Sequence, residues 1–483
     1  MITFDYDDSN RRGVVSGDPD VIAWLTEHFS YENPGAKFAR RFNRFASDRT
    51  YLITPTCRFD EGLLFVFRDA IQKEYPNTEI IITDKLQKII QPKFGNTPCA
   101  ELHIDLRDYQ RDIVDLCTHN GRGVVVLATA GGKTLTFAAL LQSIYNTVQN
   151  KSTWKVLVLV PDLGLVNQTF EDFVKYGVDF TYTKWTGGID LDLGANVIIA
   201  NLGILQSKKT DTTWIKFIDL LIVDEVHKLR KDNKINKLIK TIKTPRKFGF
   251  TGTLPDNLLD EYNIIGKIGP KIFEKRSFEL RNDKYIANAE AMVFNINYKE
   301  LPIYSRAMLT DPGAWYRMEQ EFIRNNVYRN DLIGKICCKL NNNCLILIDL
   351  IAHGEILYNT IKQNYPEKQV FFIRGDVEVE DRDEVKRIME KDNNVICIAI
   401  SKIFSTGISI NNIHYIIFAG GGKAKVKILQ SIGRGLRLHV NKNKLIIFDL
   451  ADQLKYGEEH SDRRLELYKG ECIITKLYNF QEK

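Results

Sequence analysis

The feature that most constrains the fold is a repeated unit, in which an uninterrupted apolar run of β-branched residues precedes a turn and a longer amphipathic segment. Strands that are apolar at every position are typical of a parallel sheet buried on both faces, with helices as crossovers. The unit recurs in two successive blocks. The first holds "VVVLATA", "VLVLVPD", "NVIIAN" and "LLIVDEVH", and the second holds "CLILIDL", "VFFIRGD", "VICIAIS", "HYIIFAG" and "KLIIFDL". The pattern predicts an α/β protein with two tandem parallel-sheet domains.

Shifts in composition predict where these domains begin and end. The run "QPKFGNTPCA" is typical of a linker. A mixed stretch, residues 1–95, ends in this run, and we expect it to form a small N-terminal α+β domain. We expect the first parallel-sheet domain over residues 96–300 and the second over residues 301–455. Residues 456–483 would then form a C-terminal tail. A chain of 483 residues is too long for one ordinary core, which agrees with several domains.

The overall composition is that of a globular protein, with 44% hydrophobic and 27% charged residues. No run approaches the roughly 20 apolar residues of a membrane span, and the N-terminus lacks the apolar core of a signal peptide. We therefore expect an intracellular protein without a membrane partner. Eight cysteines without a C-x-x-C pair predict free, mostly buried thiols. A net charge of +6 permits a polyanionic partner without requiring one.

A glycine-bearing stretch, "ATAGGKT" at 128–134, lies between an apolar strand and a helix-like segment. There Lys133 can reach the β- and γ-phosphates of a nucleotide, and the Thr134 hydroxyl can hold Mg²⁺. Leu127 stands where the strict motif has its first glycine, so the fragment alone could also be an ordinary tight turn. The flanking strand and helix favour a nucleotide site. The backbone N–H groups that would cradle phosphate belong to Ala130, Gly131 and Gly132.

An acidic pair, Asp224 and Glu225, follows the apolar run of "LLIVDEVH". The carboxyl end of a strand is where ligands bind in open α/β sheets. One carboxylate, expected to be Asp224, can coordinate Mg²⁺, while the other can orient and deprotonate the attacking water. A surface pair is the alternative, but its place after a buried strand favours a site. With Lys133, the pair predicts nucleotide hydrolysis.

A third stretch, "QSIGRGLR", lies far along the chain, in the second block. If it is helical, then Gln430, Arg434 and Arg437 fall at i, i+4 and i+7 on one face. Guanidinium groups from a second domain could stabilise the charge that spreads over the transferring phosphoryl group. Hydrolysis would then depend on domain closure. The alternative is a solvated basic helix face.

These stretches, together with "TGT" at 251–253, occur in the order of motifs I, II, III and VI of the superfamily 2 helicases and resemble them. The resemblance spans about residues 100–452, and it implies two RecA-like domains with ATP and Mg²⁺ as cofactors. The stretch "LRDYQ" resembles the adenine-reading Q motif, which implies nucleotide contacts by Arg107 and Gln110. The stretch "SKIFSTGISI" resembles motif V and places Gly407 at the nucleotide.

Nucleic-acid contacts are expected in three regions. By family position, the resemblance implies contacts from Pro161, Gln168 and Asn201 in the first domain, and from His353, Ser401, Lys402 and Ser405 in the second. The N-terminal run "KFARRFNRFASDR" interleaves basic and aromatic residues that suit phosphates and bases. Its basic residues are Lys37, Arg40, Arg41 and Arg44. Alternatively its phenylalanines belong to a core, since residues 1–100 carry 13 basic against 14 acidic residues.

A finer resemblance rests on "FSYENPGAKFARRF", "FSTGIS" and "GRGLR". These runs are similar to those of the UvsW-type branch-migration helicases of phages, which are likened to RecG-type fork remodellers. The resemblance implies an ATP-dependent helicase acting on forked or branched DNA in replication, recombination or repair, in the host cytoplasm if a phage encodes it. The sequence leaves the oligomeric state open, and we favour a monomer. Three alternatives stay open: a double-stranded DNA translocase such as a restriction-type motor, a nucleic-acid binding or annealing protein with a vestigial ATPase, and an RNA helicase.

Replacing Arg40, Arg41 and Arg44 together by glutamine should weaken binding to branched DNA and flatten its salt dependence. Each lost phosphate contact lowers the slope of log affinity against log salt by about 0.9. Fluorescence titration of a labelled junction at several salt concentrations measures both quantities. An unchanged affinity would assign this run to the core of the N-terminal domain.

Overall fold

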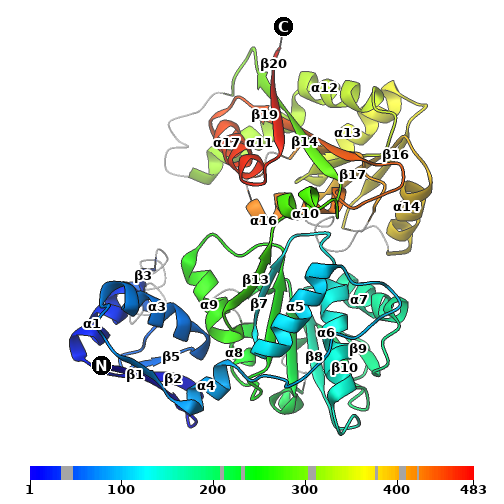
Figure 1. Cartoon of the computed structure of the whole chain (residues 1–483). Helices are drawn as coiled ribbons and strands as arrows, with labels where there is room; N and C mark the ends of the chain where they lie inside the picture. The colour runs from blue at the N-terminus through cyan, green and yellow to red at the C-terminus, as the bar shows by residue number, and fades with distance from the viewer. Residues whose placement is uncertain are drawn as a thin grey trace. The chain divides into compact units, whose positions relative to one another are not determined.

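The computed structural model describes residues 1–33, 47–206, 211–229, 234–302, 312–375, 379–401, 410–420, 422 and 424–482. The chain divides into two compact units (Figure 1). The first unit contains residues 1–127 and 132–274, and the second contains residues 128–131 and 275–483. In the described part of the chain, no helix is both long enough and apolar enough to cross a membrane.

The first unit is built on a seven-stranded sheet with the strand order β13-β7-β12-β11-β8-β10-β9. The pairings from β7 to β9 are all parallel, and every residue of the strands β7, β8, β11 and β12 is buried. The strands are β7 (Gly123–Leu127), β8 (Val156–Val160), β9 (Tyr182–Trp185), β10 (Val197–Asn201), β11 (Leu220–Asp224), β12 (Lys247–Thr251) and β13 (Lys271–Lys275). The helices are α5 (Asp108–Asn120), α6 (Lys133–Thr147), α7 (Leu163–Tyr176), α8 (Lys234–Ile239) and α9 (Leu258–Ile268), with 3₁₀ turns η2 (Ile204–Gln206), η3 (Thr213–Phe217) and η4 (Val226–Lys228).

The second unit is built on another seven-stranded parallel sheet, in the order β16-β17-β15-β18-β19-β14-β20. Two parallel sheets with crossover helices confirm the predicted pair of RecA-like domains. The strands are β14 (Asn288–Asn297), β15 (Cys344–Ile348), β16 (Gln369–Ile373), β17 (Val395–Ile400), β18 (Tyr415–Phe418), β19 (Lys444–Asp452) and β20 (Ile474–Gln481). The helices are α10 (Ser277–Asn282), α11 (Pro312–Asn325), α12 (Val327–Cys338), α13 (Ile351–Asn364), α14 (Val379–Lys391), α16 (Lys425–Gly435) and α17 (Lys455–Gly470).

The boundaries of the second unit differ from those that composition predicts. The unit begins at Lys275 rather than at 301, because β14 pairs with β19 along its length and so belongs to the second sheet. Residues 456–483 are no separate tail, since they form α17 and β20, and β20 pairs with β14 at the edge of the sheet. The side chains of β20 are mostly exposed, so no apolar run marks this strand.

The N-terminal module, residues 1–33 and 47–90, is a small α+β fold, as predicted. Its sheet has the order β5-β2-β1-β6, with β1 antiparallel to β2 and parallel to β6. Phe4, Phe59 and Phe67 are completely buried at the centre of its core. The elements are β1 (Ile2–Asp7), β2 (Arg12–Gly17), β3 (Ser30–Glu32), β4 (Arg49–Tyr51), β5 (Arg58–Phe59), β6 (Ile80–Ile82), α1 (Pro19–His28), α3 (Leu64–Glu74), α4 (Asp84–Ile90) and the turn η1 (Glu61–Leu63).

The N-terminal module does not stand apart, because it packs directly on α9 of the first parallel-sheet domain. Ile265 of α9 completes the apolar core of the module. The approach is close at η1, where a Cβ on Gly62 would lie 2.0 Å from the carbonyl oxygen of Ile265. Arg122, fully buried, donates to the carbonyl oxygens of Lys267 and Ile268 and pairs with Glu61 at 3.1 Å. Module and domain therefore form one unit.

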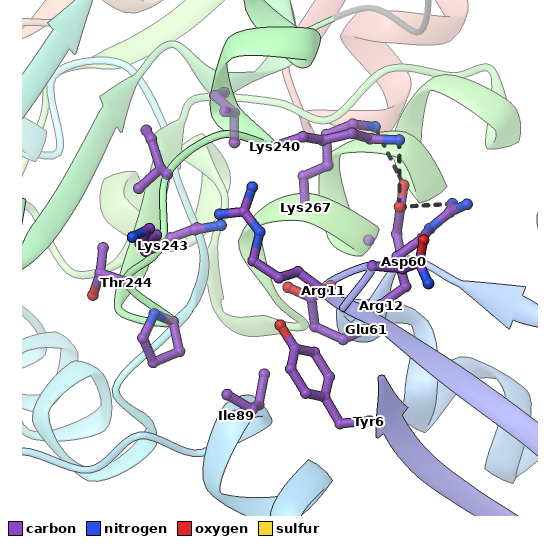
Figure 2. Close-up of a pocket in the computed structure, with 16 residues that line it drawn as sticks. Tyr6, Arg11, Arg12, Asp60, Glu61, Ile89, Lys240, Lys243, Thr244 and Lys267 are labelled. Atoms are coloured by element: carbon purple, nitrogen blue, oxygen red, sulfur yellow. Dashed lines mark hydrogen bonds and ion pairs between the residues drawn. The ribbon is translucent and has the colours of Figure 1, made fainter. Parts of the chain in front are cut away.

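A charged hub, centred on Asp60, closes the same seam (Figure 2). Its carboxylate pairs with Arg12 at 2.9 Å and with both Lys240 and Lys267 at 3.5 Å. Burial alone would raise the pKa of Asp60, but the charges of Lys267, Arg12 and Lys240 lower it to about 2. The hub links the module to the segment after α8 and to α9.

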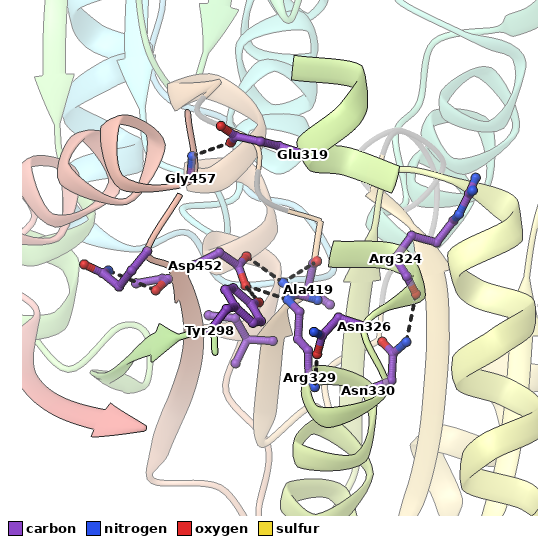
Figure 3. A network of polar contacts seen from close by, with 12 residues as sticks. Tyr298, Glu319, Arg324, Asn326, Arg329, Asn330, Ala419, Asp452 and Gly457 are labelled. Atoms are coloured by element: carbon purple, nitrogen blue, oxygen red, sulfur yellow. Dashed lines mark hydrogen bonds and ion pairs between the residues drawn. The ribbon is translucent and has the colours of Figure 1, made fainter. Parts of the chain in front are cut away.

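Buried ion pairs also organise the second unit (Figure 3). The guanidinium of Arg329, on α12, donates to Asp452 at 2.7 and 2.9 Å and to the carbonyl oxygen of Ala419 at 3.0 Å. Near it, Arg464 of α17 pairs with Asp449 at 2.6 Å. All four charged side chains are almost fully buried, so each pair stays satisfied only in this one arrangement of helix and strand.

Gly62→Ala should destabilise the first unit by roughly 1–3 kcal/mol, because the added methyl group cannot fit against Ile265. Thermal unfolding should show the transition of that unit at a lower temperature. Gly470→Ala is the matched control, since a Cβ at that helical position meets nothing within 4 Å. Equal melting temperatures for the two variants would contradict the close approach at η1.

Candidate active site

Three chemistry-bearing segments follow neighbouring strands of the first sheet. In the order β7-β12-β11 all pairings are parallel, so the three carboxyl ends meet at one edge. Thr251 lies opposite Val126, and Asp224 lies opposite Phe250. This edge is where ligands bind in open α/β sheets. The structure therefore brings together the segments expected from motifs I, II and III.

The loop at 128–132 turns tightly between β7 and α6. Gly131 N donates to Ala128 O at 2.9 Å, and Ala130 and Gly132 have positive φ values of 69° and 82°. A Cβ on Gly132 would lie 2.4 Å from Nε2 of Gln110, so this position requires glycine for both conformation and space. The loop ends at the N-terminus of α6, where backbone N–H groups favour an anion.

Gln110 supports this loop from α5. Its side chain is buried, its Oε1 accepts from Arg107 N at 2.9 Å, and its Nε2 donates to Gly132 O at 3.5 Å. The guanidinium of Arg107 donates to the hydroxyl of Tyr109 at 2.8 Å. The amide thus joins the start of α5 to the phosphate loop, while recognition of adenine by Gln110 stays a prediction.

Lys133 and Glu225 form the central ion pair of the site. Lys133 Nζ lies 3.4 Å from Glu225 Oε1, with both side chains largely buried. Glu225 has a φ of 49°, an unusual value for a residue other than glycine, and its N–H donates to Asp224 Oδ1 at 2.9 Å. This turn places two carboxylates beside each other, with the lysine facing one of them.

The two carboxylates have opposite pKa shifts. Burial and the neighbouring charge of Glu225 raise the pKa of Asp224. Burial also acts to raise the pKa of Glu225, but the charge of Lys133 and the hydrogen bond from His227 together lower it below its usual range. Glu225 is ionised and faces Lys133, whereas the pKa of the neighbouring Asp224 is raised. A carboxylate in this position suits a site that receives a divalent cation together with phosphate groups.

His227 is a member of this site that sequence reasoning did not assign. Its Nδ1 lies 3.2 Å from Glu225 Oε2 and 2.8 Å from the hydroxyl of Thr251. That hydroxyl in turn donates to Thr253 O at 2.8 Å. A chain of contacts therefore joins the acidic pair to the 251–253 segment. Only the histidine of "DEVH", three residues after Asp224, could have signalled it.

The residues needed for a magnesium–nucleotide complex fit the observed geometry. The left-handed backbone at Ala130 and Gly132 shapes a loop for phosphate, and Thr134 follows Lys133 in the first turn of α6. A buried carboxylate, Asp224, lies at the same edge of the sheet. Magnesium in proteins is held by one or two carboxylates plus substrate phosphates, which is the donor set available here.

The arginine-bearing segment differs from its predicted form. Gln430 and Arg434 lie on α16, but the helix ends at Gly435 and Arg437 follows it. The predicted helical face shared by all three residues is therefore wrong for Arg437. Just after the helix, the carbonyl oxygen of Leu436 accepts a hydrogen bond from Ala287 N at 2.8 Å. Arg434 is mostly buried, and Arg437 is half-buried.

Two of the residues predicted to contact nucleic acid in the first unit lie close together. Asn201 ends β10 opposite Val160, and Pro161 follows β8, so both lie at the carboxyl edge of adjacent strands. Gln168 is half-buried on α7. Contact with nucleic acid by these residues stays a prediction.

In the second unit, two predicted contact residues face inward. His353 is 3% exposed, its ring lies 3.1 Å from Asn330 Oδ1, and burial lowers its pKa to about 3. Ser401 is also buried, and its hydroxyl donates to Ile348 O at 2.8 Å. Both side chains are enclosed by the protein in this structure, and contact with nucleic acid by His353 and Ser401 stays a prediction. The remaining predicted residues lie outside the described part of the chain: Lys37, Arg40, Arg41, Arg44, Lys402, Ser405 and Gly407.

Comparisons with known proteins agree with this arrangement. Residues 103–256 match the family "Type III restriction enzyme, res subunit", and residues 329–439 match "Helicase conserved C-terminal domain". The chain is 28% identical over 354 residues to "ATP-dependent DNA helicase uvsW" of Enterobacteria phage T4, covering 71% of this chain and 68% of that relative. It is 26% identical over 411 residues to "DNA 3'-5' translocase XPB2" of Sulfurisphaera tokodaii, covering 78% and 87%.

A solved structure with a similar fold is that of S. cerevisiae Dbp5 bound to RNA and ADP BeF3. The TM-score is 0.54 at 15% identity, over 77% of this chain and 89% of that one. One matched family segment lies within each of the two parallel-sheet domains described above. Sequence families and fold thus agree on two tandem parallel-sheet domains.

His227→Ala should lower ATP turnover by about 10- to 100-fold, because hydrogen bonds to charged groups contribute roughly 1.5–3 kcal/mol. Nucleotide binding should persist, since Lys133 and the loop are unchanged. Steady-state hydrolysis and equilibrium binding of a fluorescent nucleotide separate the two effects. His119→Ala, which replaces an exposed histidine on α5, is the control. Turnover equal to that of the control would remove His227 from the site.

Proposed function

This chain is an ATP-hydrolysing helicase of superfamily 2, and from that premise we propose that it unwinds or branch-migrates forked and junction DNA. The observation that carries the enzymatic part is the Lys133–Glu225 pair beside Asp224, at the edge of the first sheet. The DNA substrate is supported by the relative named "ATP-dependent DNA helicase uvsW". A preference for branched DNA is supported by the N-terminal runs that resemble the UvsW type.

The geometry suggests how ATP activates the site. Before binding, Lys133 neutralises Glu225 across 3.4 Å. The phosphates of ATP compete for Lys133, and Glu225 is then released to orient the attacking water and accept its proton. Asp224 and Thr134 would hold Mg²⁺, which when bound neutralises charge on the phosphate groups. We also propose that Arg434 and Arg437 stabilise the transferring phosphoryl group and that Gln430 orients the water.

The contacts of His227 supply a route from chemistry to movement. A shift of the Glu225 carboxylate would displace His227, whose Nδ1 lies 3.2 Å from Glu225 Oε2. His227 would in turn displace Thr251, whose hydroxyl lies 2.8 Å from the same nitrogen. The 251–253 segment would thus respond when Glu225 exchanges Lys133 for water. Packing of the N-terminal module on α9 makes that module move with the first parallel-sheet domain. We propose that the module is the part that meets the branch in DNA.

A second candidate is a double-stranded DNA translocase that does not separate strands. It is favoured by the similarity to "DNA 3'-5' translocase XPB2", which extends over 87% of that relative. The same ATP site would serve both functions, so only the products made from DNA distinguish them.

A four-way junction, a forked duplex and a blunt duplex, processed side by side, should distinguish these functions. We expect ATP-dependent conversion of the junction and the fork, several-fold faster than of the blunt duplex, in a native gel assay. Lys133→Ala is the matched control and should abolish ATP turnover and conversion while DNA binding persists. ATP turnover without strand separation on any substrate would support the translocase and contradict the branch-migration proposal.

A further inference from the structure

A basic pocket lies in the seam between the N-terminal module and the first parallel-sheet domain (Figure 2). Its volume is about 120 Å³. The lining comes from β1, β2 and the turn between them, from Asp60 and η1, and from α4, the end of α8 with the segment after it, β12 and α9. All of these lie within the first unit. None of these residues belongs to the phosphate loop or to the segment 224–227. The charged residues that line it are Arg11, Arg12, Lys240, Lys243, Lys247, Lys267, Asp60 and Glu61.

The two carboxylates of this pocket are already neutralised. Asp60 pairs with Arg12, Lys240 and Lys267, and Glu61 pairs with the buried Arg122 at 3.1 Å. Six basic side chains against two acidic ones therefore leave a surplus of positive charge in the pocket. The surplus resides on cations that these carboxylates do not neutralise.

Three cations of the pocket have no carboxylate within ion-pair distance among the described residues: Arg11, Lys243 and Lys247. Arg11 donates to Thr241 O at 3.1 Å, which holds it across the seam, and it lies exposed at the rim with Lys243. Lys247, on β12, is only 6% exposed. Burial lowers the pKa of Lys247 to about 8, although the charge of Glu61 acts to raise it.

The turn that carries Arg11 is held in a costly conformation. Arg11 has a φ of 51°, a left-handed value unusual for a residue other than glycine. The turn is closed by Asp7, whose carboxylate accepts from the backbone of Ser9 at 3.0 Å and from the Asn10 side chain at 2.6 Å. A strained residue that brings a cation over a basic pocket is typical of a built binding site.

We propose that this pocket binds a phosphate group, with Lys247 beneath it and Arg11 and Lys243 at its rim. A volume of about 120 Å³ admits a phosphate group, and it is smaller than the roughly 300–1,000 Å³ of pockets that enclose drug-sized ligands. Tyr6 also lines the pocket and supplies a hydroxyl donor (Figure 2). The site goes beyond the proposed function, because neither ATP hydrolysis nor strand separation requires it.

Two sources of phosphate, the DNA backbone and free inorganic phosphate, are separated by two measurements. The first is the melting temperature in sodium phosphate against sodium chloride at equal ionic strength, with a non-hydrolysable ATP analogue filling the ATP site. The second is the salt dependence of duplex DNA binding. Both measurements use the whole chain and three variants. Lys247→Met changes the buried lysine, and a double variant, Arg11→Gln with Lys243→Gln, changes the rim. Lys73→Gln, on the exposed face of α3, is the control.

If free phosphate binds, phosphate should raise the melting temperature of the wild type and the control, and Lys247→Met should lose that rise. If the DNA backbone binds, the rim variant should lower the salt slope by about 0.9 for each lost phosphate contact, while the control leaves it unchanged. The absence of both effects overturns the proposal. ATP turnover and junction conversion, measured on the same variants, show whether the proposed function stands or fails independently.

Discussion

The parallel pairing of β7, β12 and β11 is the constraint on which the active site depends. Parallel strands all leave a sheet on the same side, so the segments that follow them collect at one edge. The phosphate loop, the acidic pair and the 251–253 segment are more than a hundred residues apart in the chain at their extremes, yet they are neighbours for this reason alone. One change of strand order would separate them.

Within that edge, electrostatics decides how the site behaves. Two adjacent carboxylates with little exposure to water repel each other, and Lys133 and His227 offset that repulsion at Glu225. The ion pair therefore stabilises the site in the absence of a nucleotide, and a phosphate group can replace Glu225 as the partner of Lys133. In the function proposed above, a nucleotide phosphate would supply an anion to Lys133 and Mg²⁺ would supply a cation to Asp224. The incoming complex would then neutralise both of the charges that its binding disturbs.

Buried charges elsewhere have a different role, which is to join distant segments. Arg122 ties η1 to the end of α9, and Arg329 ties α12 to β19 and to the strand end at Ala419. Each guanidinium donates to several acceptors at once, although Nη1 of Arg329 is buried without a hydrogen-bond partner among the described residues. These contacts favour one arrangement of the joined segments. The seam pocket departs from this rule, because Lys247 is buried and no described carboxylate lies within ion-pair distance of it. That contrast sets the pocket apart from the structural ion pairs.

The amino-acid sequence by itself determined the two parallel-sheet domains, the superfamily and the segments that carry Lys133, Asp224 and Glu225, because apolar runs and motif order are local patterns. Only the tertiary structure decided the rest. Because β14 pairs with β19, the second unit begins before residue 301. Because β20, whose side chains are mostly exposed, pairs with β14, residues 456–483 belong to that unit and form no separate tail. The structure also shows that His353 and Ser401 are buried and that His227 contacts the hydroxyl of Thr251. Burial and contact between distant residues leave no pattern in a single stretch of sequence, so three-dimensional packing alone reveals them.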